Sequence, residues 1–304
     1  MKTSYSLLSF FVCIALFAQA QTVSVVKTYQ FSSISQKAYY PVFNPDGSNL
    51  LFSSESYTGL NALNLSTQKI TVVSNEPGAG YQPVVHPDNG KIFYKVTSFT
   101  QGRRLDAIKS YNPADAQTVQ MLAPQRNLKQ PRNYHNGFLV SADKKIIKAT
   151  FGKTKNPIPV YVFTDDLKLM LYKNGVSVEL NPVADAGGYI WASLSPDNKK
   201  ILFTAARKGT FVCDLQGKIL ASFGQLNAPV WYNDELVVGM EDKDNGQFIT
   251  SSRIMLKSLN GKISLQLSDN ALIAMYPAAS KAAGKVAFNT LDGKIYIVEL
   301  KSGK

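Results

Sequence analysis

The stretch YYPVFNPDGSNLLFS, residues 39–53, joins two short apolar segments through a Pro-Asp-Gly turn. It recurs as GYQPVVHPDNGKIFY at residues 80–94 and as GYIWASLSPDNKKILFT at residues 188–204. Proline presets φ at the first central position of a type I turn, and Gly or Asn accepts the positive φ that follows. Each copy therefore predicts two antiparallel strands joined by a tight turn.

Three weaker copies extend the pattern, at residues 131–141, 229–239 and 277–289. Their first strands and those of the strong copies are placed at Pro41, Pro83, Pro131, Ala192, Pro229 and Pro277. The longest interval, 61 residues, predicts an insertion around residues 150–159 in the third repeat. Strand-turn-strand patterns such as residues 215–219 supply the outer half of each repeat. Repeats of this size are typical of a β-propeller, in which each repeat is one small sheet.

The two ends of the chain complete each other. The last repeat reaches its third strand at residues 295–300, whereas residues 22–31 (TVSVVKTYQF) have the pattern of an outer strand. We therefore expect the N-terminal strand to complete the last blade, which leaves only short and protected sheet edges. The predicted fold class is all-β, a six-bladed β-propeller closed by this N-terminal strand.

The first twenty residues have the pattern of a signal peptide. Lys2 precedes an apolar run over residues 7–17, and Ala18-Gln19-Ala20 is a small-x-small cleavage site. We expect residues 1–20 to be removed, residues 21–304 to form one domain, and the protein to be periplasmic or secreted. Cys213 is then the only cysteine, so no internal disulfide is expected. No later segment is apolar enough to predict a membrane span.

The motif P-x-F-x-P-D-G-x-x-L-x-F-S at residues 41–53 resembles the WD40-like repeat of the TolB C-terminal propeller. The six repeats and the closing N-terminal strand are similar to that family as well. The resemblance begins near residue 39 and is strongest in the first, second and fourth repeats. It implies a periplasmic or secreted binding propeller. About eighteen residues separate the leader from the first repeat, too few for the small N-terminal α/β domain of TolB, so no particular partner is implied.

The sequence offers little catalytic chemistry. Residues 175–179 (GVSVE) begin like a G-x-S-x-G nucleophile elbow but end in Glu between two predicted strands, so we expect a hairpin. His86 and His135 fall in predicted turns. The two positions before each first strand contain no carboxylate, so no catalytic residue, metal or cofactor is predicted. The alternatives are a hydrolase or lyase of glycosidase or lactonase type, with acids from another loop such as that of Glu55, and a scaffold subunit of an envelope assembly.

The positions before the first strands carry aromatic and amide side chains instead. Such side chains are typical of interface hot spots and of stacking platforms. Packing between blades is the competing interpretation. The predicted ligand-binding residues at the channel mouth are Tyr39, Tyr40, Tyr81, Gln82, Lys129, Gln130, Arg132, Trp191 and Tyr276. The expected partner of this non-catalytic protein, a monomer or an assembly subunit, is a protein, peptide or glycan of the cell envelope.

Positive charge is concentrated in one part of the chain. The formal net charge is +12, and residues 91–155 contain thirteen Lys or Arg against three Asp, which gives +10. This asymmetry predicts a positive field over the second and third blades that attracts acidic partners and weakens with salt. Solvation of strand exteriors is the alternative reason for these charges. Export argues against nucleic acid as a partner.

Overall fold

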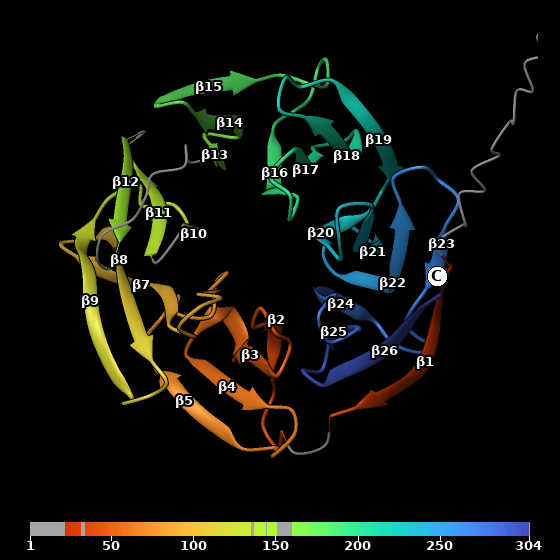
Figure 1. Cartoon of the computed structure of the whole chain (residues 1–304), viewed down its shortest axis with the longest axis horizontal. Helices are drawn as coiled ribbons and strands as arrows, with labels where there is room; N and C mark the ends of the chain where they lie inside the picture. The colour runs from red at the N-terminus through yellow and green to blue at the C-terminus, as the bar shows by residue number, and fades with distance from the viewer. Residues whose placement is uncertain (1–21, 32–33, 135–136, 144, 151–159, 304) are drawn as a thin grey trace, which may run out of the picture.

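The computed structural model describes residues 22–31, 34–134, 137–143, 145–150 and 160–303. These residues form seven antiparallel sheets arranged as a ring, each sheet being one blade (Figure 1). The predicted signal peptide lies outside the described residues. No helix in the described part of the chain is long and apolar enough to cross a bilayer.

The strands follow the ring in chain order. Blade 1 contains β2 (Tyr39–Phe43), β3 (Asn49–Ser53), β4 (Leu60–Asn64) and β5 (Ile70–Ser74), with the short helix η1 (Glu55–Tyr57). Blade 2 contains β6 (Val84–Val85), β7 (Ile92–Thr100), β8 (Arg103–Asn112) and β9 (Gln117–Gln125). Blade 3 contains β10 (Arg132–Tyr134), β11 (Gly137–Ala142) and β12 (Lys145–Thr150), and blade 4 contains β13 (Tyr161–Asp165), β14 (Lys168–Lys173) and β15 (Val176–Leu180).

The remaining three blades each contain four strands. Blade 5 contains β16 (Tyr189–Leu194), β17 (Lys200–Ala205), β18 (Gly209–Asp214) and β19 (Ile219–Gly224). Blade 6 contains β20 (Asn227–Trp231), β21 (Leu236–Asp244), β22 (Ile249–Ser258) and β23 (Ser264–Gln266). Blade 7 contains β24 (Ala274–Ser280), β25 (Lys285–Thr290), β26 (Ile295–Gly303) and β1 (Thr22–Gln30).

The prediction of six blades was wrong. Strands β13, β14 and β15 form a sheet of their own, within the 61-residue interval that was assigned to the third repeat and its insertion. The turn between β13 and β14 explains the error, because it has no Pro-Asp-Gly. Asp166 and Leu167 both have positive φ (47° and 62°), as in a type I′ hairpin, which normally carries Asn-Gly. The predicted insertion at residues 150–159 lies largely outside the described residues.

The prediction that the N-terminal strand completes the last blade is confirmed. β1 pairs antiparallel with β26, from Thr22 opposite Gly303 to Gln30 opposite Tyr296. The backbone N–H of Phe31 continues the contact by donating to the carbonyl of Ile295 at 2.8 Å. The ring is therefore closed by strands from opposite ends of the chain, which lie side by side in Figure 1.

The core lies between neighbouring blades. An almost fully buried phenylalanine recurs in the second strand of blades 1, 2, 3, 5 and 7. These residues, each at most 1% exposed, are Phe52, Phe93, Phe138, Phe203 and Phe288. Apolar clusters around them join residues of adjacent sheets, so burial between blades holds the ring together.

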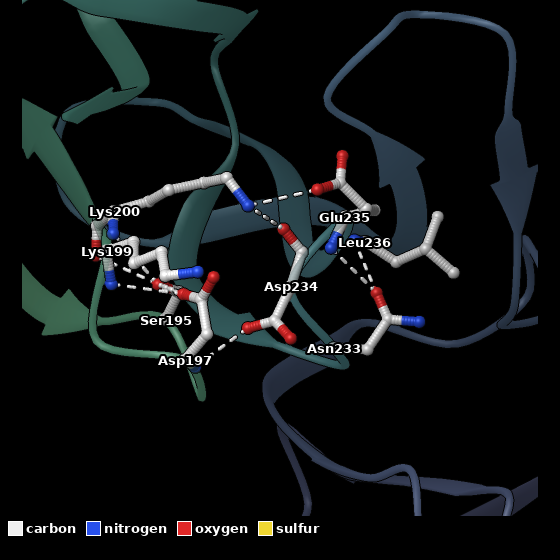
Figure 2. Close-up of polar contacts among 8 residues, drawn as sticks. All are labelled: Ser195, Asp197, Lys199, Lys200, Asn233, Asp234, Glu235 and Leu236. Carbon is white, nitrogen blue, oxygen red and sulfur yellow. Dashed lines mark hydrogen bonds and ion pairs between the residues drawn. The ribbon is translucent and has the colours of Figure 1, made fainter.

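The Pro-Asp turns lie at the end of the channel away from the strand starts, and one of them links two blades. In blade 5, Ser195 Oγ and the N–H of Lys199 donate to Asp197 Oδ1 at 2.6 and 3.0 Å, so this carboxylate holds the turn together. The N–H of Asp197 donates to Asp234 Oδ1 of blade 6 at 2.9 Å, and Lys200 Nζ donates to the Asp234 carbonyl at 2.9 Å (Figure 2). Side chain and main chain thus join the two turns.

Substituting Asp234 tests this link. Asp234→Ala leaves the Asp197 N–H without its acceptor, and we expect a loss of about 1–2 kcal/mol in the free energy of unfolding. Asp234→Asn keeps an acceptor oxygen and is expected to lose less than half of that, as measured by denaturant unfolding. Glu235→Gln removes only an ion pair with Lys200 whose carboxylate is 60% exposed, and should change stability by less than about 0.5 kcal/mol. Equal losses in the two Asp234 variants would contradict the hydrogen-bond role.

Candidate binding site at the channel mouth

The end of the ring where the first strands begin is built from repeated irregular backbone. Five residues with positive φ recur here: four are the second or third residue of β2, β16, β20 and β24, where the register shifts as in a β-bulge, and the fifth lies two residues before β6. They are Tyr40 (56°), Gln82 (49°), Trp191 (54°), Ala228 (44°) and Tyr276 (50°). Four of the five precede a proline, although proline favours negative φ in its predecessor. Strained backbone of this kind is common next to functional sites, where a bulge changes the direction of a side chain.

Four tyrosines form a continuous cluster at this end. Tyr40 stacks on Tyr57 with ring centroids 3.9 Å apart, and it contacts Tyr276 at 4.8 Å. Tyr57 meets the ring of Tyr81 edge-on at 4.7 Å. The cluster therefore joins blades 1, 2 and 7 across the mouth of the channel.

Tyr57 comes from the connection between β3 and β4. Tyr39 at the start of β2 pairs with Ser53 at the end of β3, so this connection lies at the mouth end of blade 1. Ser56 and Tyr57 both have positive φ (58° and 59°), which is an outlier for a bulky side chain. The strained loop places Tyr57 between Tyr40 and Tyr81.

Burial keeps three phenols of the cluster, those of Tyr40, Tyr57 and Tyr276, protonated. Burial raises the pKa of Tyr40, of Tyr276 and, most strongly, of Tyr57, where the neighbouring Tyr40 adds to the effect. A phenol with a raised pKa is a neutral donor and acceptor of hydrogen bonds and a poor nucleophile. The cluster is therefore suited to contact a ligand rather than to attack it.

A cavity of about 360 Å³ opens beneath the tyrosines. This is within the range of about 300–1,000 Å³ that is typical of small-molecule sites. Trp191 and Trp231 form part of its wall, and Trp231 extends it along β20 towards the other end of the channel. Four prolines also line it: Pro41, Pro83, Pro229 and Pro277.

A second cavity of about 380 Å³ adjoins the first on the side of blades 2, 3 and 4. Two lysines line it, and both are paired with carboxylates. Lys95 Nζ lies 3.3 Å from Asp106 Oδ2, in a pair whose side chains are 8% and 9% exposed, and Lys129 Nζ lies 2.8 Å from Asp165 Oδ1. The charge of both lysines is thus neutralised locally.

Arg132 lies where the two cavities meet, since it lines both. Its Nη2 donates to Gln82 Oε1 at 3.4 Å, and its Nη1 donates to the carbonyl of Pro131 at 3.3 Å. No carboxylate of the described residues forms an ion pair with it. The guanidinium is half-buried and uncompensated, unlike the two lysines beside it.

The structure brings most of the predicted site residues together. Eight of the nine line one or both cavities: Tyr40, Tyr81, Gln82, Lys129, Gln130, Arg132, Trp191 and Tyr276. Gln130 belongs to the second cavity, where its amide can donate to the Tyr81 carbonyl and accept from Lys95 Nζ. Tyr39 lies elsewhere. It is 8% exposed and packs against Gly293 of blade 7, as the interpretation of packing between blades expected.

Sequence reasoning missed several residues of the mouth. Tyr57, Lys95 and Trp231 line the cavities from positions outside the starts of the first strands. From the loop that contains Tyr57, only Glu55 was considered, as a possible catalytic acid. The aromatic residue two positions before Gly59 was the feature of the sequence that could have indicated Tyr57. Asp242, which lines neither of the two cavities but bonds to the start of β20, was missed as well. It accepts a hydrogen bond from Asn227 Nδ2 at 2.8 Å, and burial raises its pKa.

The basic stretch of residues 91–155 is less uniform in space than in sequence. Lys95 and Arg104 share Asp106, Lys109 pairs with Glu76 at 2.7 Å, and Lys129 pairs with Asp165. The exposed members that form no ion pair with a described residue include Arg103, Arg126 and Lys145. Four of the thirteen Lys and Arg residues are thus paired, and among the described residues that line the two cavities Arg132 is the cation without an ion pair.

Neither the cysteine thiol nor a metal-binding cluster adds chemistry to the mouth in the described part of the chain. Cys213 is buried in blade 5, and burial raises the pKa of its thiol to about 12. The described residues contain no group of three or more His, Cys, Asp and Glu side chains arranged to hold a metal. In the part of the chain that the structure describes, the mouth thus offers stacking faces, neutral hydroxyls and one cation without an ion pair.

No protein-family model matches the sequence, and a search of curated proteins also finds no match. Among solved structures, a putative TolB from Agrobacterium tumefaciens is similar at 16% identity, with a TM-score of 0.53 over 88% of this chain and 90% of its own. The β-propeller domain of Cps50 (Swd1) from Myceliophteria thermophila has 10% identity and a TM-score of 0.54, covering 91% and 99%. An oligogalacturonate lyase in complex with manganese has 12% identity and a TM-score of 0.50, covering 88% and 78%. Likeness at these identities shows the shared propeller fold alone.

Proposed function

We propose that this protein is an exported, TolB-like binding propeller that captures a protein, peptide or glycan at the mouth of its channel without catalysing a reaction. The observation that carries the proposal is the convergence of tyrosines and tryptophans from five blades on one cavity. Aromatic side chains give large, rigid contact areas at a small cost in conformational entropy, which is why they dominate binding hot spots. The strained backbone at Tyr40, Trp191 and Tyr276 costs free energy, and such strain is typical of binding sites rather than of positions that only support the fold.

Export is part of the proposal and is supported by the leader pattern of residues 1–20. Processing near Ala20 would leave β1 at the start of the mature chain, so the ring-closing strand would be available as soon as the leader is removed. N-terminal sequencing of the protein recovered from the periplasm or the medium tests this part separately from binding.

Alanine substitution of Tyr40, Trp191 and Tyr276 together tests the mouth as the binding site. We expect the triple variant to remain folded and to lose at least tenfold in ligand capture from the envelope extract of the producing cells. The control is Phe99→Ala, because Phe99 is 72% exposed and lies outside both cavities. Unchanged capture by a folded triple variant would show that the mouth is not the binding site. In that case, crosslinking in cells that joins the sides of the blades to other envelope proteins would favour the scaffold function.

A propeller hydrolase or lyase is a second candidate, and Asp242 is the observation in its favour. Its raised pKa and its hydrogen bond to Asn227 near Tyr276 are features of a carboxyl group that can exchange a proton. The oligogalacturonate lyase in complex with manganese has the same kind of ring. This candidate requires that the purified protein turn over a glycan or lactone and lose that activity in Asp242→Asn, and inactivity of the unmodified protein on both substrate classes would reject it.

A further inference from the structure

The geometry points to an acidic glycan as the ligand of the mouth, with a uronate carboxylate bound by Arg132 and a sugar ring stacked on the tyrosine cluster. This inference rests on the proposed function, because it names the ligand class of the same site. It begins from the charge at the junction of the two cavities. Burial of an unpaired charge is costly, so an uncompensated and half-buried guanidinium is a feature that a bound anion would explain.

The local comparison singles out Arg132. Lys95 and Lys129 lie in the same cavity, yet each is held by a carboxylate within 3.3 Å. Among the described residues, Arg132 donates only to the Gln82 amide oxygen, over a long distance, and to the carbonyl of its own neighbour Pro131. A guanidinium binds a carboxylate through two parallel hydrogen bonds, so the group that is free here is also the group best matched to a uronate.

The walls of the first cavity favour a sugar over an extended peptide. A peptide that binds by adding a strand needs main-chain N–H donors along the edge that it meets. The inner strands present Pro41, Pro83, Pro229 and Pro277 to this cavity, and proline has no N–H. These four positions therefore offer no main-chain donor to a peptide, whereas the neutral phenols and ring faces of Tyr40, Tyr57 and Tyr276 offer a sugar both hydrogen bonds and stacking surface.

The test measures binding of a galacturonate tetramer to the purified protein by tryptophan fluorescence, because Trp191 and Trp231 line the cavity. The matched probe is the same tetramer after reduction of its carboxylates to alcohols, which keeps the ring faces and removes the charge. We expect the acidic tetramer to bind at least tenfold more tightly than the reduced one, with a preference that weakens as salt is added.

Arg132→Gln is expected to abolish this preference and to bind both tetramers as weakly as the unmodified protein binds the reduced one. Arg132→Lys should restore part of it, since lysine keeps the charge without the two-pronged geometry. Arg103→Gln is the matched control, because Arg103 is an exposed arginine of the neighbouring blade outside both cavities, and it should leave the preference unchanged.

Several outcomes would overturn the inference. They are binding of neither tetramer, equal binding of both, and a preference that survives in Arg132→Gln. Tighter binding of an acidic peptide than of the galacturonate tetramer would show that the ligand is a peptide and not a glycan. If the triple aromatic variant still loses capture of an envelope ligand in these cases, the proposed function stands and only the identity of the ligand has failed.

Discussion

Asp106→Asn is expected to lower the free energy of unfolding by about 3–5 kcal/mol, because it leaves the buried ammonium of Lys95 without its carboxylate. The two side chains are 8% and 9% exposed and lie 3.3 Å apart. Lys95 Nζ would keep its hydrogen bond to the Leu128 carbonyl at 3.3 Å, its contact with Gln130 and its place 5.9 Å from the centre of the Tyr81 ring, none of which carries a negative charge. Denaturant unfolding monitored by tryptophan fluorescence measures the loss.

Two controls separate the buried charge from a general effect of losing an ion pair. Glu179→Gln breaks the pair with Lys168, in which the Glu179 and Lys168 side chains are 48% and 58% exposed, and should leave the stability nearly unchanged, since solvent screens such a pair. The double variant Lys95→Met with Asp106→Asn removes the stranded charge and should recover most of the stability. A double variant as unstable as Asp106→Asn alone would contradict the assignment of the loss to Lys95.

The loss in Asp106→Asn should also depend on pH. Burial already lowers the pKa of Lys95 from its ordinary value of 10.5, while Asp106 opposes that shift. Removing Asp106 lowers the pKa of Lys95 further. The unfolded chain then binds more protons than the folded one between this lowered pKa and 10.5, so the free energy of unfolding rises with pH in that window. We expect the gap between the variant and the unmodified protein to narrow from pH 7 to about pH 9, and a constant gap would show that Lys95 does not titrate.

Phe203→Ala is expected to cost about 3–5 kcal/mol, the usual range for deleting a buried aromatic ring. Phe203 is 0% exposed in the cluster between blades 4 and 5, and its ring meets Tyr189 edge-on at 5.5 Å. Five blades carry such a phenylalanine in their second strand, so the deletion removes a repeated element of the ring. The free energy of unfolding from urea titration measures the effect.

Phe99→Ala is the matched control, since the same ring at 72% exposure contributes little burial. Its effect should stay within about 0.5 kcal/mol. A loss below 1 kcal/mol in Phe203→Ala would mean that neighbouring side chains collapse into the space, and that packing at this blade interface is looser than the structure indicates.

The repeats could be read from sequence where local chemistry marks them. The Pro-Asp turn of Asp197 and the closing strand at residues 22–31 follow from turn preferences and from a missing strand at the other end. The fourth blade could not be read in this way, because the turn at Asp166 and Leu167 uses positive φ without glycine or asparagine. Only the pairing of β14 with both β13 and β15 distinguishes a separate sheet from an insertion.

The candidate site was likewise predictable only in part from the sequence. The register before the first strands placed Tyr40, Trp191 and Tyr276 at one end of the ring, because every blade repeats the same direction of its inner strand. The register could not distinguish these cavity-lining residues from Tyr39, which is also an aromatic residue at the start of a first strand. In the structure Tyr39 packs against Gly293 of the last blade instead.

The sequence by itself determined an all-β ring, its closure by the N-terminal strand, and the end of the channel where aromatic side chains gather, since these depend on local turns and on a period. The tertiary structure alone decided the number of blades, the arrival of Tyr57 in the tyrosine cluster, and which cation stays unpaired. Lys95, Lys129 and Arg132 look alike as charges along the chain. They differ because Asp106 and Asp165 are brought to the two lysines by pairing between strands and blades, and no carboxylate of the described residues is brought to Arg132.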